Sequence, residues 1–415
     1  MQPTAWLVAL AALSCAGDAA LTNFDRQMRV AERLERLPFF QRELRQHLEL
    51  FQEPRGLVGS RLGVENYTCT SGVSATVPKS VHALRPGDVR VLGAVGDSLT
   101  AGNGVLATKF SGVINEYRHY AFMAGCVDDY SAHSSVPNFI RALQQKSHAN
   151  FNPRLRGCAV GKSRYNDYDL ARFNVARPSR ESKHLVKQLK YLVKIMNKHL
   201  TKKQFHEDWK LIQMFIGSND LCDSCLFWKR YTPITFTRNV RQALRFIRDH
   251  IPRSLVNVVG VPNLDLIREV EPTFVCKLAH RLGCPCLHKK KVGEWKETMV
   301  AFQDATDELV REPEFRGRHD FAATFQPFIR GIEKPPTLPE GGIDYSYFAP
   351  DCFHFGRIGH DTAARIVWNQ LLEPVGAKPI YTSWEQVRRA EITCPPEKCP
   401  FMRTPDNSED CDRFL

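Results

Sequence analysis

The sequence contains no long hydrophobic run. After the first twenty residues, no stretch reaches the roughly 18 consecutive apolar residues that a membrane-spanning helix needs. The segment 406–415 is acidic and has few apolar side chains, unlike the hydrophobic tail of a lipid-anchor signal. Internal repeats and low-complexity segments are missing as well. With 43% hydrophobic and 25% charged residues, the sequence favours a soluble globular protein.

The N-terminus has the pattern of a secretory signal. An apolar run covers Ala5–Leu13, and mostly small residues follow at 14–20. This pattern predicts a signal peptide over residues 1–20 and a secreted, extracellular protein, although no Lys or Arg precedes the run. The alternative interpretation is the start of a buried helix.

The cysteine count points to the same compartment. The sequence has 13 cysteines, and 12 remain when Cys15 is removed with the predicted signal. An even number suits disulfide bonds in an oxidising environment. Close spacings such as Cys222/Cys225 also permit a zinc site, but a secreted chain favours disulfides, whose pairing stays open. Asn66, in an Asn-Tyr-Thr triplet, is the only N-glycosylation acceptor.

The net charge of +12 favours anionic partners, such as acidic lipid headgroups or sulfated glycans. A row of lysines in and just after the predicted helix 181–200 could dock on an anionic membrane, whereas the plainer interpretation is a solvated basic surface. These lysines are Lys183, Lys187, Lys190, Lys194, Lys198, Lys202 and Lys203. We expect no nucleic-acid partner, because no known binding module is recognisable.

Strand and helix patterns alternate through the middle of the chain. Apolar runs predict buried strands, and apolar residues at three- and four-residue steps predict helices. The predicted strands are 89–95, 210–216, 254–261 and 320–329, and the predicted helices are 181–200, 236–250, 295–310 and 359–372. This order predicts an α/β fold with helices on both faces of a parallel sheet. We expect four segments: the signal 1–20, an N-terminal helix and wrapping segment 21–85, a main domain 86–375 and a Cys- and Pro-rich tail 376–415.

Three polar clusters carry candidate chemistry. Ser98 follows the first predicted strand in a Gly-Asp-Ser turn, and Asn219 follows the second, where its amide could donate to an oxyanion. Asp351 and His354 precede the last helix. The imidazole could act as the base for a serine, and the carboxylate could hold the other ring nitrogen. Each cluster alone is ordinary turn or capping chemistry.

Taken in this order, the clusters resemble those of the GDSL/SGNH hydrolase superfamily. Further blocks resemble its phospholipase B-like branch of the membrane-associated type, and the similarity spans roughly residues 80–405. The blocks are Ser80–Asp88, Gly96–Gly104, Asp208–Lys210, Phe215–Asp223, Phe348–His354 and Leu372–Gly376. The resemblance implies a three-layer α/β/α fold around a mainly parallel, flavodoxin-like sheet.

The resemblance also implies a role for each candidate residue. Ser98 would be the nucleophile, and its N–H would form part of the oxyanion hole together with the Asn219 amide. His354 would be the general base and then the general acid, oriented by Asp351. The expected reaction is hydrolysis of acyl esters of phospholipids and lysophospholipids through an acyl-serine intermediate, without a metal or organic cofactor.

The chain departs from the family pattern at Ser179, where a glycine is expected whose N–H completes the oxyanion hole. A residue with a Cβ is penalised at positive φ. If the family geometry needs a positive φ, Ser179 would either strain the loop or turn its N–H away, whereas at a negative φ it would cost little. We therefore expect an enzyme slower than its glycine version. The sequence also shows one such unit and no membrane anchor, where the membrane-associated type has several units and an anchor. A small-ester or glycan-acetyl esterase and a catalytically weak lipid-binding protein are the alternatives.

Overall fold

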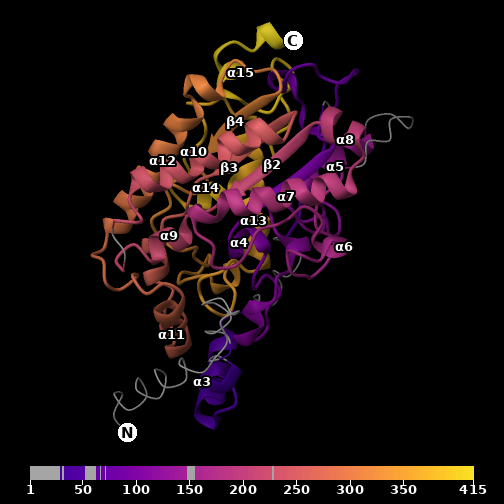
Figure 1. Ribbon diagram of the computed structural model, residues 1–415. Coiled ribbons are helices and arrows are strands. Elements are labelled where there is room, and N and C mark those ends of the chain that lie inside the picture. The colour runs from indigo at the N-terminus through magenta and orange to yellow at the C-terminus, as the bar shows by residue number, and fades with distance from the viewer. Residues whose placement is uncertain are drawn as a thin grey trace.

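A parallel four-stranded sheet forms the centre of the molecule. The computed structural model describes residues 29, 32–51, 62–65, 67–70, 72–146, 155–226 and 229–415. The strands are β1 (Val91–Gly96), β2 (Lys210–Phe215), β3 (Ser254–Val259) and β4 (Phe321–Gln326), side by side in that order (Figure 1). Every strand residue is buried, which explains why the strands have continuous apolar runs rather than an alternating pattern.

An irregular segment of the chain, here called a lane, lies beside the edge of β1 that does not pair with β2. Arg156 pairs with Val91, and Asn174 pairs with Ala94, both in the parallel direction. When this lane is counted, the chain order across the sheet is 2-1-3-4-5, which is the flavodoxin type. The structure thus confirms the predicted α/β fold with its mainly parallel sheet. All strands stay parallel, but successive strands are added on one side of β1 before β2 and on the other side from β2 onward. Ligands bind at such a topological switch point, which here lies next to β1.

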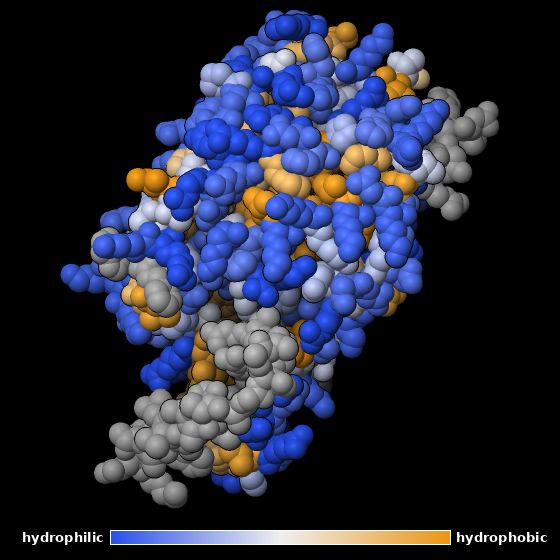
Figure 2. Space-filling model, viewed as in Figure 1, coloured by the Kyte–Doolittle hydropathy of each residue, from blue (hydrophilic) through white to orange (hydrophobic). Residues whose placement is uncertain are grey.

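Helices cover both faces of the sheet. Helices α7 (Leu185–His199), α10 (Pro233–His250) and α12 (Glu294–Val310) pack side by side on one face, while α5 (Val136–Lys146) and α13 (Arg357–Leu372) pack together on the other (Figure 1). Right-handed crossovers produce this division, because the chain moves one way along the sheet before β2 and the other way after it. The seven lysines just before, on and just after α7 are all exposed, and this face is mostly hydrophilic (Figure 2).

Two predicted helices begin clearly away from the expected residue, and the other two begin within two residues of it. The helix predicted at 181–200 starts as a 3-10 turn, Ser182–His184, before α7. The helix predicted at 236–250 starts earlier, at Pro233, because the Thr232 hydroxyl caps it and proline suits a first turn. The other helices of the described residues are α3 (Pro38–Glu49), α4 (Ser98–Ala101), α6 (Tyr168–Ala171), α8 (Lys202–Glu207), α9 (Ser218–Cys222), α11 (Phe274–Gly283), α14 (Trp384–Arg389) and α15 (Pro405–Glu409).

The two flanking segments attach to the main domain at different places. Helix α3 packs against α11 through a small apolar cluster that includes Phe40 and Leu278. The tail lies against the segment before β1, where the Asn407 side chain donates to the His82 carbonyl. The division of the chain into four segments stays a prediction, and its first part, residues 1–20, lies outside the described residues.

Disulfides join segments that are far apart in the sequence. All twelve cysteines after Cys15 are paired, so the expectation of disulfides rather than zinc ligands is confirmed. The pairs are Cys69–Cys394, Cys126–Cys158, Cys222–Cys284, Cys225–Cys286, Cys276–Cys352 and Cys399–Cys411. Cys15 and Asn66 lie outside the described residues. Among the helices described, none is long and apolar enough to cross a membrane.

Candidate active site

Ser98 lies at the start of α4, immediately beyond the carboxyl end of β1. The Asp97 side chain caps the helix by accepting a hydrogen bond from the Leu99 N–H at 3.0 Å. Gly102 ends the helix in the left-handed conformation, with φ of 73°. The serine is therefore placed by a strand on one side and by a capped turn on the other, and its side chain is 6% exposed.

Gly96, the last residue of β1, requires a glycine for steric reasons. A Cβ there would lie 2.3 Å from the Phe215 carbonyl oxygen and 2.4 Å from the Thr100 hydroxyl. The side-chain amide of Gln188 on α7 binds both backbone groups of Gly96, accepting from its N–H at 2.9 Å and donating to its carbonyl at 2.8 Å. This two-point contact fixes the end of the strand that carries the serine.

His354 and Asp351 complete a hydrogen-bonded chain with Ser98. The Nε2 atom of His354 lies 2.7 Å from the Ser98 Oγ, and its Nδ1 lies 2.5 Å from the Asp351 Oδ2. The other carboxylate oxygen of Asp351 accepts from the N–H groups of Phe353 and His354. With Nδ1–H donating to the carboxylate, Nε2 is free to accept the serine proton, which is the arrangement of a nucleophile, base and orienting acid.

The environment of Asp351 keeps it ionised. Burial acts to raise the pKa of Asp351, but the charge of His354 and the hydrogen bonds from His354 and Phe353 outweigh it, so that the pKa is lowered. An ionised carboxylate stabilises the imidazolium that forms when His354 takes the serine proton. Asp97 differs, because burial raises its pKa to about 7.

One cavity brings all five predicted site residues together. Its lining includes Ser98, Ser179, Asn219, Asp351 and His354. Asn219 lies in α9, beyond β2, and its amide donates one hydrogen to the Arg180 carbonyl at 3.0 Å. Within the described residues, the second amide hydrogen has no acceptor and could bind a ligand. The positions agree with the sequence prediction, while the catalytic roles themselves remain proposals.

Ser179 adopts the backbone conformation that favours glycine. Its φ is 56°, so of the two predicted consequences the structure has the strained loop. The loop is held by Arg118, a fully buried side chain that donates to the carbonyls of Asn174 and Ala176 and pairs with Glu116. Within the part of the chain that is described, the N–H groups of Ser98 and Ser179 have no acceptor.

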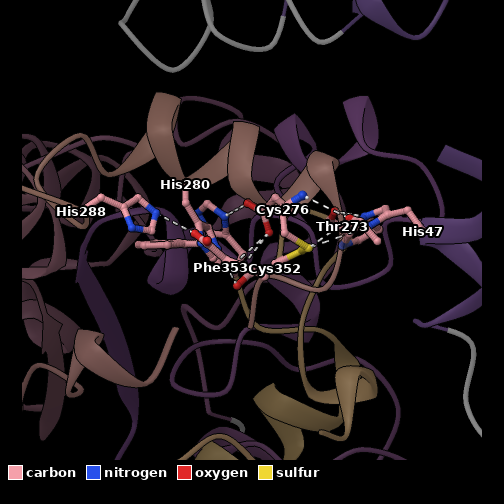
Figure 3. The surroundings of a disulfide bond; sticks show 11 residues. His47, Thr273, Cys276, His280, His288, Cys352 and Phe353 are labelled. Carbon is pink, nitrogen blue, oxygen red and sulfur yellow. Dashed lines mark hydrogen bonds and ion pairs between the residues drawn. A yellow bond between two sulfur atoms is a disulfide. The ribbon is translucent and has the colours of Figure 1, made fainter. Parts of the chain in front are cut away.

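The loop that carries Asp351 and His354 is fastened from outside the sheet. Cys352 has a φ of 62° and is joined to Cys276 of α11 by a disulfide (Figure 3). His280, also on α11, lies 3.0 Å from the Cys352 carbonyl through Nε2 and 2.7 Å from Glu271 through Nδ1. Both partners are hydrogen-bond acceptors, and the contact with Cys352 attaches the loop to α11.

Helix α3 reaches the same loop through His47. Its Nε2 lies 2.5 Å from the Pro350 carbonyl, and its Nδ1 lies 2.8 Å from the Thr273 hydroxyl (Figure 3). Burial lowers the pKa of His47, which favours a neutral ring that donates to the carbonyl and accepts from the hydroxyl. His47 also lies near the sulfurs of Cys276 and Cys352, but these are joined to each other and offer no thiolate to a metal.

The sequence analysis did not identify the supporting residues. Gln188 and Arg118 have no neighbours in the sequence that mark them, and the backbone groups that they bind in Gly96 and Asn174 lie tens of residues away. His47 and His280 are two of 14 histidines, and neither belongs to a recognisable motif. The only available signal was indirect: Cys352 lies between Asp351 and His354, so any disulfide it formed would reach the catalytic loop.

Comparison with known proteins agrees with this geometry. The family model of GDSL-like lipase/acylhydrolase matches residues 92–367. The chain belongs to this family. The expectation of an ester-hydrolysing enzyme is therefore confirmed at the level of the family, whose matched region contains Ser98, Ser179, Asn219, Asp351 and His354.

Curated relatives narrow the resemblance. Human "Phospholipase B1, membrane-associated" is 37% identical over 372 residues, which cover 87% of this chain and 25% of the relative. The mouse protein of the same name is 36% identical and covers 82% of this chain and 23% of the relative. The chain thus spans about a quarter of the length of these relatives. A solved GDSL-like lipase structure from Parabacteroides merdae ATCC 43184 has a TM-score of 0.35 and 14% identity, covering 67% of this chain and 92% of that chain.

Proposed function

We propose that this protein hydrolyses acyl esters of phospholipids and lysophospholipids through an acyl-Ser98 intermediate. The observation that carries the proposal is the Ser98–His354–Asp351 chain of hydrogen bonds at the wall of a cavity that Asn219 and Ser179 also line. The names of the curated relatives support the choice of lipid substrates.

In the proposed acylation step, the Ser98 Oγ attacks the ester carbonyl carbon while the His354 Nε2 takes its proton. The carbonyl oxygen becomes an oxyanion, which accepts hydrogen bonds from the Ser98 and Ser179 N–H groups and from the Asn219 amide. His354 then returns the proton to the leaving alcohol oxygen as the carbon–oxygen bond breaks. Asp351 holds the ring and balances its charge throughout.

Deacylation repeats these steps with water. His354 removes a proton from the water as its oxygen attacks the acyl carbon, and the same donors hold the second oxyanion. Collapse of this intermediate releases a fatty acid and restores the Ser98 hydroxyl with the proton from His354. Every proton in the cycle passes through one nitrogen atom, so each step depends on the His354 Nε2 being free to accept a proton.

The disulfides support a secreted protein. Six disulfides suit an oxidising compartment, in agreement with the proposed signal at 1–20 and the proposed sugar at Asn66. The exposed lysines of α7 would allow peripheral contact with an anionic membrane or glycan.

The proposed substrate class can be tested by product analysis. The protein should release fatty acid from phosphatidylcholine and lysophosphatidylcholine in mixed micelles, and Ser98→Ala should not. Hydrolysis of a short nitrophenyl ester without release from either lipid would instead favour a small-ester esterase. Binding of lipid without hydrolysis of any ester would favour the weak lipid-binding protein, an alternative for which the strained Ser179 is the specific observation.

A further inference from the structure

A second, apolar cavity adjoins the catalytic one. It lies at the carboxyl ends of β3 and β4 and against α13 and α14, and no Lys, Arg, Asp or Glu among the described residues lines it. Representative lining residues are Leu99, Leu264, Phe328, Ala363, Ile366 and Trp384. A charged group placed there would lose its water without gaining a partner of opposite charge. The cavity therefore suits a hydrocarbon chain and excludes a phospholipid headgroup.

The catalytic residues form the boundary between the two cavities. Leu99 follows the nucleophile, and Ser218 precedes Asn219; both line the apolar cavity, while their neighbours line the catalytic one. Phe353, which precedes His354, lines both. The apolar cavity thus begins beside the point where Ser98 would attack a carbonyl carbon, which is where the chain of an acyl group must continue.

We infer that this cavity receives the acyl chain that is transferred to Ser98, and that the Phe353 side chain controls entry to it. The inference rests on the proposed ester hydrolysis and adds the place of the chain. The cavity holds about 40 Å³ of free space as it stands, compared with roughly 150 Å³ for a cavity that binds benzene. An acyl chain therefore enters only when a side chain moves aside.

Phe353 is the side chain that can make this movement. Its N–H is bound to the Asp351 carboxylate, and the preceding residue is held by a disulfide, so the backbone is fixed. Its ring is only half buried and stands between the two cavities, near the rings of His354 and His280. Figure 3 places it beside Cys352. Rotation of the ring opens the passage without disturbing the hydrogen bonds of the triad.

The inference is tested with nitrophenyl esters of increasing chain length. Burial of each methylene should raise kcat/KM by up to about fourfold until the cavity is filled. Ala363→Leu, on α13, should lower kcat/KM for the octanoate at least tenfold while leaving the acetate within about twofold. Ile366→Ala enlarges the same cavity and should shift the optimum to longer chains. Phe353→Ala leaves the passage open. The difference in kcat/KM between the best chain length of the wild type and the other chain lengths should therefore become smaller.

Ala301→Leu is the matched control, because it adds the same side chain to α12, at a half-buried position outside both cavities. It should leave the chain-length profile unchanged. An octanoate-to-acetate ratio that is the same in wild type, Ala363→Leu and Ile366→Ala would overturn the inference. If Ala363→Leu melts much lower than wild type, the Ile366→Ala profile decides. If the folded wild-type protein hydrolysed none of these esters, that result would instead count against the proposed function itself.

Discussion

The two halves of the catalytic apparatus are held in different ways. Ser98 lies just beyond the end of β1, where strand pairing, a capped turn and the Gln188 amide hold it in position. His354 and Asp351 stand on an irregular loop, which depends on a disulfide to α11 and on His47 and His280. The first half is secured by contacts within the fold's core, and the second by individual long-range contacts. The second half should therefore be the easier one to disturb.

Removal of either reacting side chain should nearly abolish hydrolysis, because the reaction needs both halves of the site. Ser98→Ala and His354→Ala should each lower kcat by roughly 10⁴-fold, since only binding and the oxyanion donors would remain. The rates can be compared on one nitrophenyl ester at equal folded concentration. Near-normal turnover in either folded variant would exclude that residue from the proposed role.

Asn219→Ala tests the nucleophile half without touching the triad. It should lower kcat by about 10²–10³-fold, because one oxyanion donor is lost, and should change the melting temperature little. The amide also binds the Arg180 carbonyl, so a structural role is the competing explanation. A large drop in melting temperature with a modest loss of kcat would favour that explanation.

The disulfide at the loop tests the histidine half. Serine replacement of both Cys276 and Cys352 should lower kcat about tenfold or more, because small displacements of a catalytic group are costly. Serine replacement of both Cys399 and Cys411 removes a disulfide from the tail instead and is the matched control. It should leave kcat within about twofold. Equal losses of kcat in the two double variants would mean that the loop has no special dependence on its disulfide.

Ser179→Gly should improve the enzyme slightly. Because Ser179 already has a φ of 56°, glycine would remove strain of roughly 1 kcal/mol rather than restore a missing donor. We expect a turnover increase of at most about threefold, because the donor is already in place, and a melting temperature about 2 °C higher. Arg253→Gly changes a residue with a similar φ of 51° before β3 and should leave turnover unchanged. Slower turnover in Ser179→Gly would contradict this account of the loop.

Asp97→Asn should alter how stability depends on pH, and it should change activity less than any of the substitutions above. Folding holds a proton on Asp97 up to about pH 7, whereas the unfolded chain releases it near pH 4. The wild type therefore loses stability as pH rises between these values, by up to about 4 kcal/mol. Asparagine keeps an oxygen for the Leu99 N–H and carries no charge. Thermal unfolding at pH 5 and pH 8 should show a smaller decrease for the variant, and parallel curves would refute this assignment.

The features that could be predicted from the sequence are those that depend on residues close together in the chain. The four strands, the helices between them and the residues after β1 and β2 follow from local patterns, and the parallel order brings Ser98 and Asn219 to one edge. Twelve cysteines permit many pairings, so the link from Cys276 to Cys352 could not be predicted. The same holds for His47 and Gln188, whose contacts exist only after the chain has folded.

The central claim is that Ser98 is an activated nucleophile. A fluorophosphonate probe reacts with such a serine, and peptide mass mapping identifies the labelled residue. The account predicts one probe per chain on Ser98, no labelling of Ser98→Ala and much slower labelling of His354→Ala. Labelling at a different serine, or none in the folded wild-type protein, would contradict it.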